Sequence, residues 1–92
     1  MIISFACRDT EKLFNNKYVK RFHPFIRQAH IKLKLLNSAS NMNDLRSPPG
    51  NRLEQLLGTR KNQCSIRINN QWRICFTWQG TNAYNVEIVD YH

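Results

Sequence analysis

Apolar and polar residues alternate along the stretch from residue 63 to residue 78, QCSIRINNQWRICFTW. Alternation with period two over this length predicts two antiparallel strands with one face in the core, folded over at the Asn-Asn pair. A two-residue loop would pair Ile66 with Arg73 and put a charge on the apolar face. A three-residue loop over residues 69–71 pairs Ile66 with Ile74 and keeps that face apolar. We expect the second register, since a slip of one residue would turn every side chain to the other face.

The expected register places Arg67 directly opposite Arg73 on the polar face of this hairpin. Like charges directly across a pair of strands repel one another and lower stability. Two arrangements would relieve the repulsion: an acidic side chain between the guanidinium groups, or an anion bound to them. When the hairpin is taken alone, solvation or pairing with a glutamate explains the arrangement as well as anion binding does.

Two helices are predicted ahead of the hairpin, after an N-terminal strand. The first six residues, MIISFA, form an apolar run typical of a strand with Ile3 and Phe5 on one face. A short helix is expected over residues 11–15, after a polar capping residue. A second helix is expected over residues 25–39, because a proline at its start suits the first turn of a helix. Its apolar positions, which we expect in the core, recur at helical spacing: Ile26, Ala29, Leu33 and Leu36.

One further strand is predicted on each side of the hairpin in sequence. Residues 52–56 follow the rigid loop SPPGN and have the pattern of a strand, and residues 83–89 alternate as a second one. The side chains of this last strand that we expect to point inward are Tyr84, Val86 and Ile88. The whole pattern predicts one small domain, residues 1–92, with its elements in the order β-α-α-β-β-β-β.

The register of the last two strands stays open in the sequence. A three-residue loop over residues 79–81 aligns Arg73 with Glu87, and a five-residue loop aligns Arg73 with Val89. In both registers the tail, residues 90–92, emerges near the strand end that carries the two arginines. The pattern therefore gathers cationic, acidic and imidazole side chains at one end of the sheet.

The chain is strongly basic, with 14 Lys and Arg residues against 6 Asp and Glu and a net charge of +8. The basic residues recur along the chain, which is typical of a folded domain that binds nucleic acid or an acidic protein, although a generally basic soluble protein has the same composition. The three cysteines are an odd number without a CxxC pair, so we expect reduced thiols in the cytoplasm and no metal site. No stretch approaches the roughly 20 apolar residues of a membrane span, and the N-terminus lacks the layout of a signal peptide.

The residues gathered near the arginine pair suit cleavage of an RNA strand without a metal ion. Attack of a 2′-hydroxyl on the adjacent phosphorus needs a general base, a general acid and cations that stabilise the charged transition state. Arg67 and Arg73 suit the last role, because a guanidinium binds phosphate oxygens in a bidentate manner. His92 can exchange protons near neutral pH, and Asp90 can fix its tautomer or act as a base. Tyr91 can stack on a base or donate to a phosphate.

Each of these residues also has a simpler interpretation. A terminal His92 is commonly a frayed end, Asp90 can simply end the strand, and Tyr91 can pack on the sheet edge. Basic residues of turns are commonly solvated, although a basic turn beside the site would also hold an RNA backbone. The candidate phosphate ligands outside the hairpin are Arg52, Arg60 and Lys61.

Four stretches of the chain, taken together, resemble the HigB branch of the RelE/ParE superfamily of bacterial toxins. They are the opening MIISF, the stretch DLRSPPGNRLEQL, the pattern G-x-R-x-x-Q-x-SIR-x-N-x-x-WRI-x-F and the terminal DYH. The resemblance covers essentially the whole chain. The combination of SIR, WRI and DYH in a basic chain of 92 residues is specific, whereas any one part would be weak.

This resemblance implies a fold, an activity and a partner. The expected fold is α+β, with two N-terminal helices packed on a twisted, mainly antiparallel sheet that carries a concave basic active face. Members of the branch are ribosome-dependent mRNA interferases, which cleave messenger RNA in the ribosomal A site and need no cofactor. They are held inactive by a helix-turn-helix antitoxin called HigA, through which alone we expect contact with operator DNA.

The resemblance also implies roles for individual residues. Arg73 would bind the scissile phosphate, Asp90 and His92 would transfer protons, and Tyr91 would position the RNA. HigB toxins can carry a histidine in an L-H-P-L tract before the hairpin, where this chain has LEQL with Glu54. Glu54 would then serve as a general base, pair with an arginine or mark a slower enzyme, and we expect weak intrinsic toxicity.

Two other functions are compatible with the same residues. ParE-type members of the superfamily poison DNA gyrase and need no acid–base groups, so the terminal DYH and the arginine pair argue against that function. A non-catalytic RNA-binding module would use the basic sheet only to hold phosphates. Cleavage of RNA, damage to DNA, or binding without cleavage would distinguish the three.

Overall fold

The computed structural model describes residues 1–56 and 62–90 of the chain, which form helices and a four-stranded sheet. The helical elements are α1 (Arg8–Phe14), η1 (Lys20–Phe25), α2 (Ile26–Ser38), η2 (Met42–Arg46) and η3 (Pro49–Asn51). The strands are β1 (Glu54–Gln55), β2 (Cys64–Arg67), β3 (Trp72–Gln79) and β4 (Asn82–Asp90). The sheet has the order β1-β2-β3-β4, and each neighbouring pair is antiparallel. The expected α+β fold is therefore confirmed.

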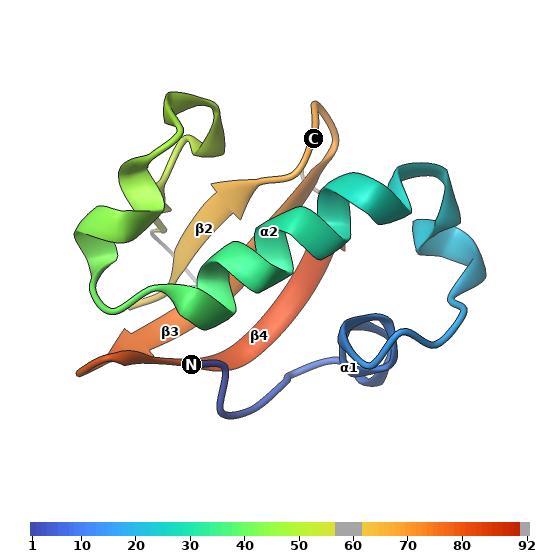
Figure 1. Cartoon of the computed structure of the whole chain (residues 1–92), viewed down its shortest axis with the longest axis horizontal. Helices are drawn as coiled ribbons and strands as arrows, with labels where there is room; N and C mark the ends of the chain where they lie inside the picture. The colour runs from blue at the N-terminus through green and yellow to red at the C-terminus, as the bar shows by residue number, and fades with distance from the viewer. Residues whose placement is uncertain (57–61, 91–92) are drawn as a thin grey trace.

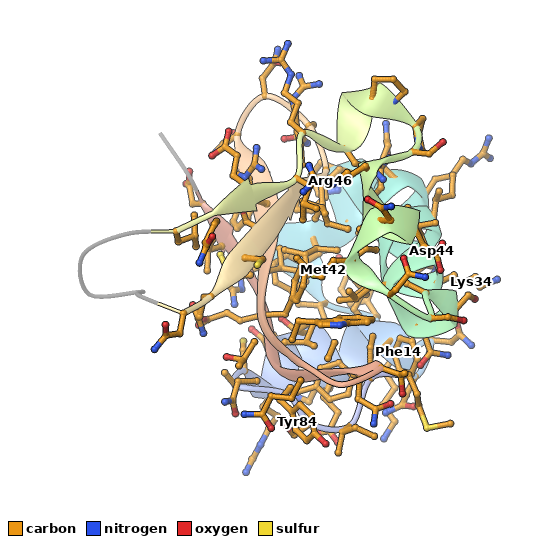
Figure 2. All side chains as sticks on the ribbon, turned by 90° about the vertical axis from the view of Figure 1, so that its left-hand side faces the viewer. Phe14, Lys34, Met42, Asp44, Arg46 and Tyr84 are labelled. Carbon is orange, nitrogen blue, oxygen red and sulfur yellow. The ribbon has the colours of Figure 1, made fainter. Side chains whose placement is uncertain are left out.

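The helices lie on one side of the sheet. Helix α2 crosses the sheet, while η2 and η3 lie at one end of the molecule and α1 and η1 at the other (Figure 1). The view turned by 90° shows β1 and β2 on the side away from α2 (Figure 2). The side chains between the two layers include Leu33, Leu36, Ile66, Ile74 and Phe76, none of them more than 1% exposed. None of the described helices covers the opposite face of the sheet (Figure 2), so that face is where a polar site can be built.

The hairpin between β2 and β3 has the register that the apolar pattern predicts. Ile66 pairs with Ile74, and Arg67 pairs with Arg73. The turn has three residues, and it is closed by a hydrogen bond of 2.9 Å from the Ile68 amide to the Trp72 carbonyl. The burial of the isoleucines therefore sets the position of the arginines on the other face.

The turn between β3 and β4 differs from both expected loops. The two strands are joined at Gly80 and Thr81 alone, and an irregularity on β4 then shifts the register by one residue. At the shift Asn85 has a positive φ of 54°, a conformation that asparagine tolerates better than most residues. Beyond the bulge Arg73 pairs with Val89, as the five-residue loop would require.

The bulge also corrects the expected facing of β4. Val86 and Ile88 are buried as expected, but Ala83 is buried in place of the half-buried Tyr84. A β-bulge adds one residue to one strand, so the alternation of faces changes phase across it. The prediction for Tyr84 was wrong because it assumed one continuous alternation.

The N-terminal segment does not form the expected strand. It runs beside β4 in two isolated parallel bridges, from Ile2 to Ala83 and from Phe5 to Val86. Ile2 and Phe5 pack against the core, whereas Ile3 is 48% exposed. The inward residues are three positions apart, so this segment does not keep the two-residue alternation on which the prediction for Ile3 rested.

The two predicted helices are present with shifted ends. Helix α1 begins earlier than expected, at Arg8, whereas α2 matches the second predicted helix to within one residue at each end and is preceded by the 3₁₀ helix η1. Pro24 lies inside η1, and Phe25 has a φ of −129°, outside the helical range. The apolar stripe of α2 faces the core as predicted. No helix among the described residues is long and apolar enough to cross a membrane.

Thr10 joins the two layers through a buried hydrogen bond. Its side chain is 0% exposed, and its hydroxyl oxygen accepts the Ile88 amide of β4 at 3.0 Å. A buried donor that loses its acceptor costs about 1–3 kcal/mol. We therefore expect Thr10→Val to lower the free energy of unfolding by this amount in urea titrations followed by circular dichroism.

Thr10→Ser is the matched control for this variant, because it keeps the acceptor and removes only a methyl group. Its expected cost is about 1 kcal/mol. Equal losses of stability in the two variants would contradict a role for the hydroxyl oxygen.

Candidate functional site

Charged side chains surround a hollow on the face of the sheet that the described helices leave uncovered. The hollow has a volume of about 310 Å³. It is lined by Arg52, Glu54, Arg67, Asn69, Asn70 and Arg73. Three guanidinium groups thus meet one carboxylate, an excess of positive charge that suits a bound anion such as a phosphate.

Strand pairing explains why these side chains share one face. Glu54 pairs with Ser65, and Arg67 pairs with Arg73. Residues directly opposite in an antiparallel sheet point to the same face, as do residues two apart on one strand. Because Ser65 and Arg67 are two apart on β2, Glu54, Ser65, Arg67 and Arg73 all face the hollow side.

Arg73 is held firmly in this arrangement. Its side chain is only 7% exposed. Its Nε donates to the Ser65 hydroxyl at 2.8 Å, and its Nη2 donates to the carbonyls of Ser65, at 3.3 Å, and Arg52. A buried guanidinium needs such acceptors. They fix the plane of the group at the wall of the hollow, so Arg73 is a preorganised cation.

Arg67 is held more loosely than Arg73. It is half-buried, and its Nη2 donates to the side-chain oxygen of Asn70 in the adjoining turn. The turn is itself ordered by Asn69, whose side-chain oxygen accepts the amides of Gln71, at 2.8 Å, and Trp72, at 2.9 Å. The Asn-Asn turn therefore both closes the hairpin and orients the second arginine.

Behind the hollow, a buried asparagine anchors the segment that carries Arg52. Asn51 is 0% exposed, and its amide nitrogen donates to the carbonyls of Leu45, at 3.1 Å, and Ser47, at 3.2 Å. Its side-chain oxygen accepts from the ammonium of Lys32 on α2. The next residue, Arg52, has a φ of 45°, and its carbonyl accepts from Arg73. Asn51 thus ties α2 and the preceding loop to the acceptor that orients Arg73.

Lys32 brings a further positive charge close to the site. Burial lowers the pKa of its ammonium from the usual value, and the nearby guanidinium of Arg67 lowers that pKa further. The sequence pattern gave no sign of this contact, because Lys32 lies away from the apolar stripe of its helix. Asn51, Ser65, Asn69 and Asn70 were likewise missed, since their roles depend on contacts between segments.

Comparison with known protein families identifies the family of this chain. Residues 11–92 match the model of the HigB-like toxin family, described as the RelE-like toxin of the type II toxin–antitoxin system HigB. The chain belongs to the HigB-like toxin family. The predicted membership of the RelE/ParE superfamily is confirmed with it.

Two curated proteins resemble parts of this HigB-like chain. Toxin HigB-1 of Vibrio cholerae is 50% identical over 54 residues, which cover 59% of this chain and 57% of that toxin. An uncharacterized protein of Haemophilus influenzae is 38% identical over 55 residues, covering 60% of this chain and 54% of that protein. The matched part thus spans little more than half the length of each relative.

Apart from Asp90, the predicted site residues of the HigB-like chain fall into two groups. Arg52, Glu54, Arg67 and Arg73 come together around the hollow. Four other predicted residues lie outside the described part of the chain: Arg60, Lys61, Tyr91 and His92. Their roles stay predictions.

Asp90 lies at the same end of the sheet as the hollow but on its other face. It pairs with Trp72, which packs on the core, so its side chain points to the helix side. There its carboxylate accepts from the side-chain amide of Gln71 at 3.0 Å. A metal site has no support within residues 1–56 and 62–90, where no three His, Cys, Asp or Glu side chains form a group suited to a metal ion.

Replacing Asn51 tests whether this anchor holds the site together. Asn51→Ala would remove the donor from the buried hydrogen bond to the Leu45 carbonyl and from the partly buried one to the Ser47 carbonyl. We expect a loss of about 1–3 kcal/mol in the free energy of unfolding, together with weaker protection of the Arg73 Nε–H from hydrogen exchange by NMR.

Asn43→Ala is the matched control, because Asn43 is exposed in the neighbouring 3₁₀ helix η2. We expect a change within about 0.5 kcal/mol for this surface position. An Asn51→Ala protein as stable as this control, with Arg73 exchange unchanged, would rule out the anchoring role.

Proposed function

We propose that this HigB-like chain is a ribosome-dependent mRNA endoribonuclease, the toxin of a type II toxin–antitoxin module. Its expected partners are messenger RNA in the ribosomal A site and a HigA-type helix-turn-helix antitoxin, both in the cytoplasm. The observation that carries the proposal is the convergence of Arg52, Arg67 and Arg73 with Glu54 around one hollow. Guanidinium groups at fixed positions suit an RNA phosphate whose negative charge grows during reaction.

The proposed reaction is attack of a ribose 2′-oxygen on the adjacent phosphorus. The new P–O2′ bond forms as the P–O5′ bond breaks, which leaves a 2′,3′-cyclic phosphate and a 5′-hydroxyl. Arg73 would stabilise the charge on the non-bridging oxygens, because its other hydrogen bonds already fix its orientation and little reorganisation is needed. Arg52 and Arg67 would hold the neighbouring backbone.

Proton transfer has one candidate inside the hollow and others beyond it. Glu54 lines the hollow as a carboxylate and could take the proton from the 2′-hydroxyl. Asp90 points to the helix side, where it would act only by orienting neighbouring residues such as His92. His92 and Tyr91 stay candidates for the general acid and for RNA positioning, on the resemblance stated above.

Cleavage of a defined message on programmed ribosomes tests the role of Arg73. Removal of one donor that stabilises transition-state charge costs about 10²–10³ in rate, so we expect Arg73→Ala to lose that much single-turnover cleavage at A-site codons. Arg27→Ala is the matched control, since Arg27 is exposed on α2. Equal cleavage by the two variants, with both folded, would remove Arg73 from the mechanism.

The same assay separates the proton-transfer candidates. A chain lacking His92 should lose about 10²–10⁴ in rate if the imidazole acts as acid or base. Survival of cleavage in that chain, with loss in Glu54→Gln, would move the acid–base role to Glu54. Binding without cleavage by the unaltered chain would favour a non-catalytic RNA-binding module, and DNA damage on induction would favour a gyrase poison.

Growth arrest tests the consequence of a glutamate at position 54. A carboxylate beside three guanidinium groups attracts them and offsets their charge, so we expect weak toxicity that Glu54→His increases. The measurement is colony formation after induced expression, with toxin amounts matched by immunoblot. The expectation would be contradicted if the unaltered chain arrested growth as completely as the Glu54→His variant does.

A further inference from the structure

A second basic surface lies away from the hollow, on the segment that forms α1 and η1. Residues 8–24 contain five Lys and Arg residues against two acidic ones. One acid is already paired, because Asp9 accepts from Arg21 Nε at 3.1 Å. This segment lies at the end of the molecule opposite η2 and η3 (Figure 1).

The surface is hollowed and carries an exposed aromatic ring. A groove of about 590 Å³ has Tyr18 and the basic residues Lys12, Lys20 and Arg21 in its lining, together with Asp9, Val19 and Pro24. Tyr18 is 67% exposed and is not among the described side chains that pack in or against the core. Its ring lies 5.4 Å from that of the exposed His23, at an angle of 50°. Packing in the core therefore does not explain why an aromatic residue stands at this exposed position.

We propose that the groove between α1 and η1 binds single-stranded RNA, with phosphates on Lys12 and Lys20 and a base stacked on Tyr18. Cations along a groove combined with an exposed ring are the features that bind single strands without regard to sequence. Lysine is depleted in the centres of protein–protein interfaces, so a lysine-lined groove favours RNA over an acidic protein.

The position of the groove fits a second contact beside the proposed cleavage site. Trp72, next to Arg73 in sequence, stacks on Phe25 at 5.0 Å between ring centroids and contacts Phe22 edge-on at 5.7 Å. The guanidinium of Arg21 lies 4.4 Å from the centre of the Phe22 ring. A continuous series of packed rings thus joins the groove wall to the strand that carries Arg73. The groove would hold RNA that is not itself cleaved, on the helix side of the same end of the sheet.

Binding of a 2′-O-methyl RNA decamer, measured by fluorescence anisotropy, tests the groove. This probe lacks the 2′-hydroxyl, so it reports binding and not cleavage. We expect Tyr18→Ala to weaken binding roughly five- to a hundredfold, with Tyr18→Phe close to the unaltered chain, because stacking needs only the ring. The double variant Lys12→Gln, Lys20→Gln should reduce the slope of affinity against salt by about 1.4 on logarithmic axes.

The matched control is Arg27→Gln with Lys34→Gln, which removes two exposed charges from α2 outside the groove. An equal reduction in slope by the control pair, or an unchanged affinity in Tyr18→Ala, would overturn the proposal. Loss of antitoxin binding in Tyr18→Ala with RNA binding intact would assign the groove to a protein and overturn it as well.

The inference rests on the proposed function only for the choice of RNA as the partner. The two can fail separately, because cleavage depends on Arg73 and decamer binding on Tyr18. A chain that binds the decamer through Tyr18 but cleaves nothing would retain the groove and lose the nuclease. A chain that cleaves on ribosomes but binds the decamer independently of Tyr18 would support the nuclease and overturn the groove proposal.

Discussion

The opposition of Arg67 and Arg73 is the constraint on which the rest of the site depends. Two like charges across a pair of strands are unfavourable, and yet the register cannot move to separate them. A slip of one residue would take Ile66 and Ile74, both 0% exposed, out of the core. The hydrophobic face therefore holds the two cations together, at a cost that surrounding acceptors reduce and that an anion would reduce further. The two faces of the same hairpin thus serve the stability of the fold and the proposed binding of an anion.

The acceptors around Arg73 come from segments far apart in sequence. Ser65 is on the neighbouring strand, whereas the Arg52 carbonyl belongs to the loop that Asn51 anchors. Lys32 extends this connection to α2. The guanidinium thus depends on the packing of the helix layer even though it faces away from that layer. A change in the loop or in α2 can reach the proposed site without touching it.

The sequence predicted those features that depend on local alternation. The hairpin register, the arginine pair and the stripe of α2 follow from periods of two and of 3.6 residues, and each agrees with the structure. The features that it did not predict depend on contacts across the fold. Asn51 looks like an ordinary loop residue until its three partners are seen, and the bulge at Asn85 breaks the alternation on which the facing of Tyr84 was predicted. The exposure of Ile3 was also not predicted, because the N-terminal segment forms two isolated bridges to β4 and not the regular strand that the sequence predicted.

The bulge at Asn85 has a consequence for how this protein could change through evolution. Side chains alternate between the two faces of the sheet along β4, and the bulge shifts this alternation by one residue between the turn end of the strand and its C-terminal end. The length of the Gly80–Thr81 turn therefore does not determine which face residues 86–90 point to. Gain or loss of a single codon at this position would exchange the residues that β4 presents to the helices with those it presents to the open face. The hairpin with the arginine pair would be left as it is. The faces to which the side chains of β4 point can therefore change while the β2–β3 hairpin keeps its register.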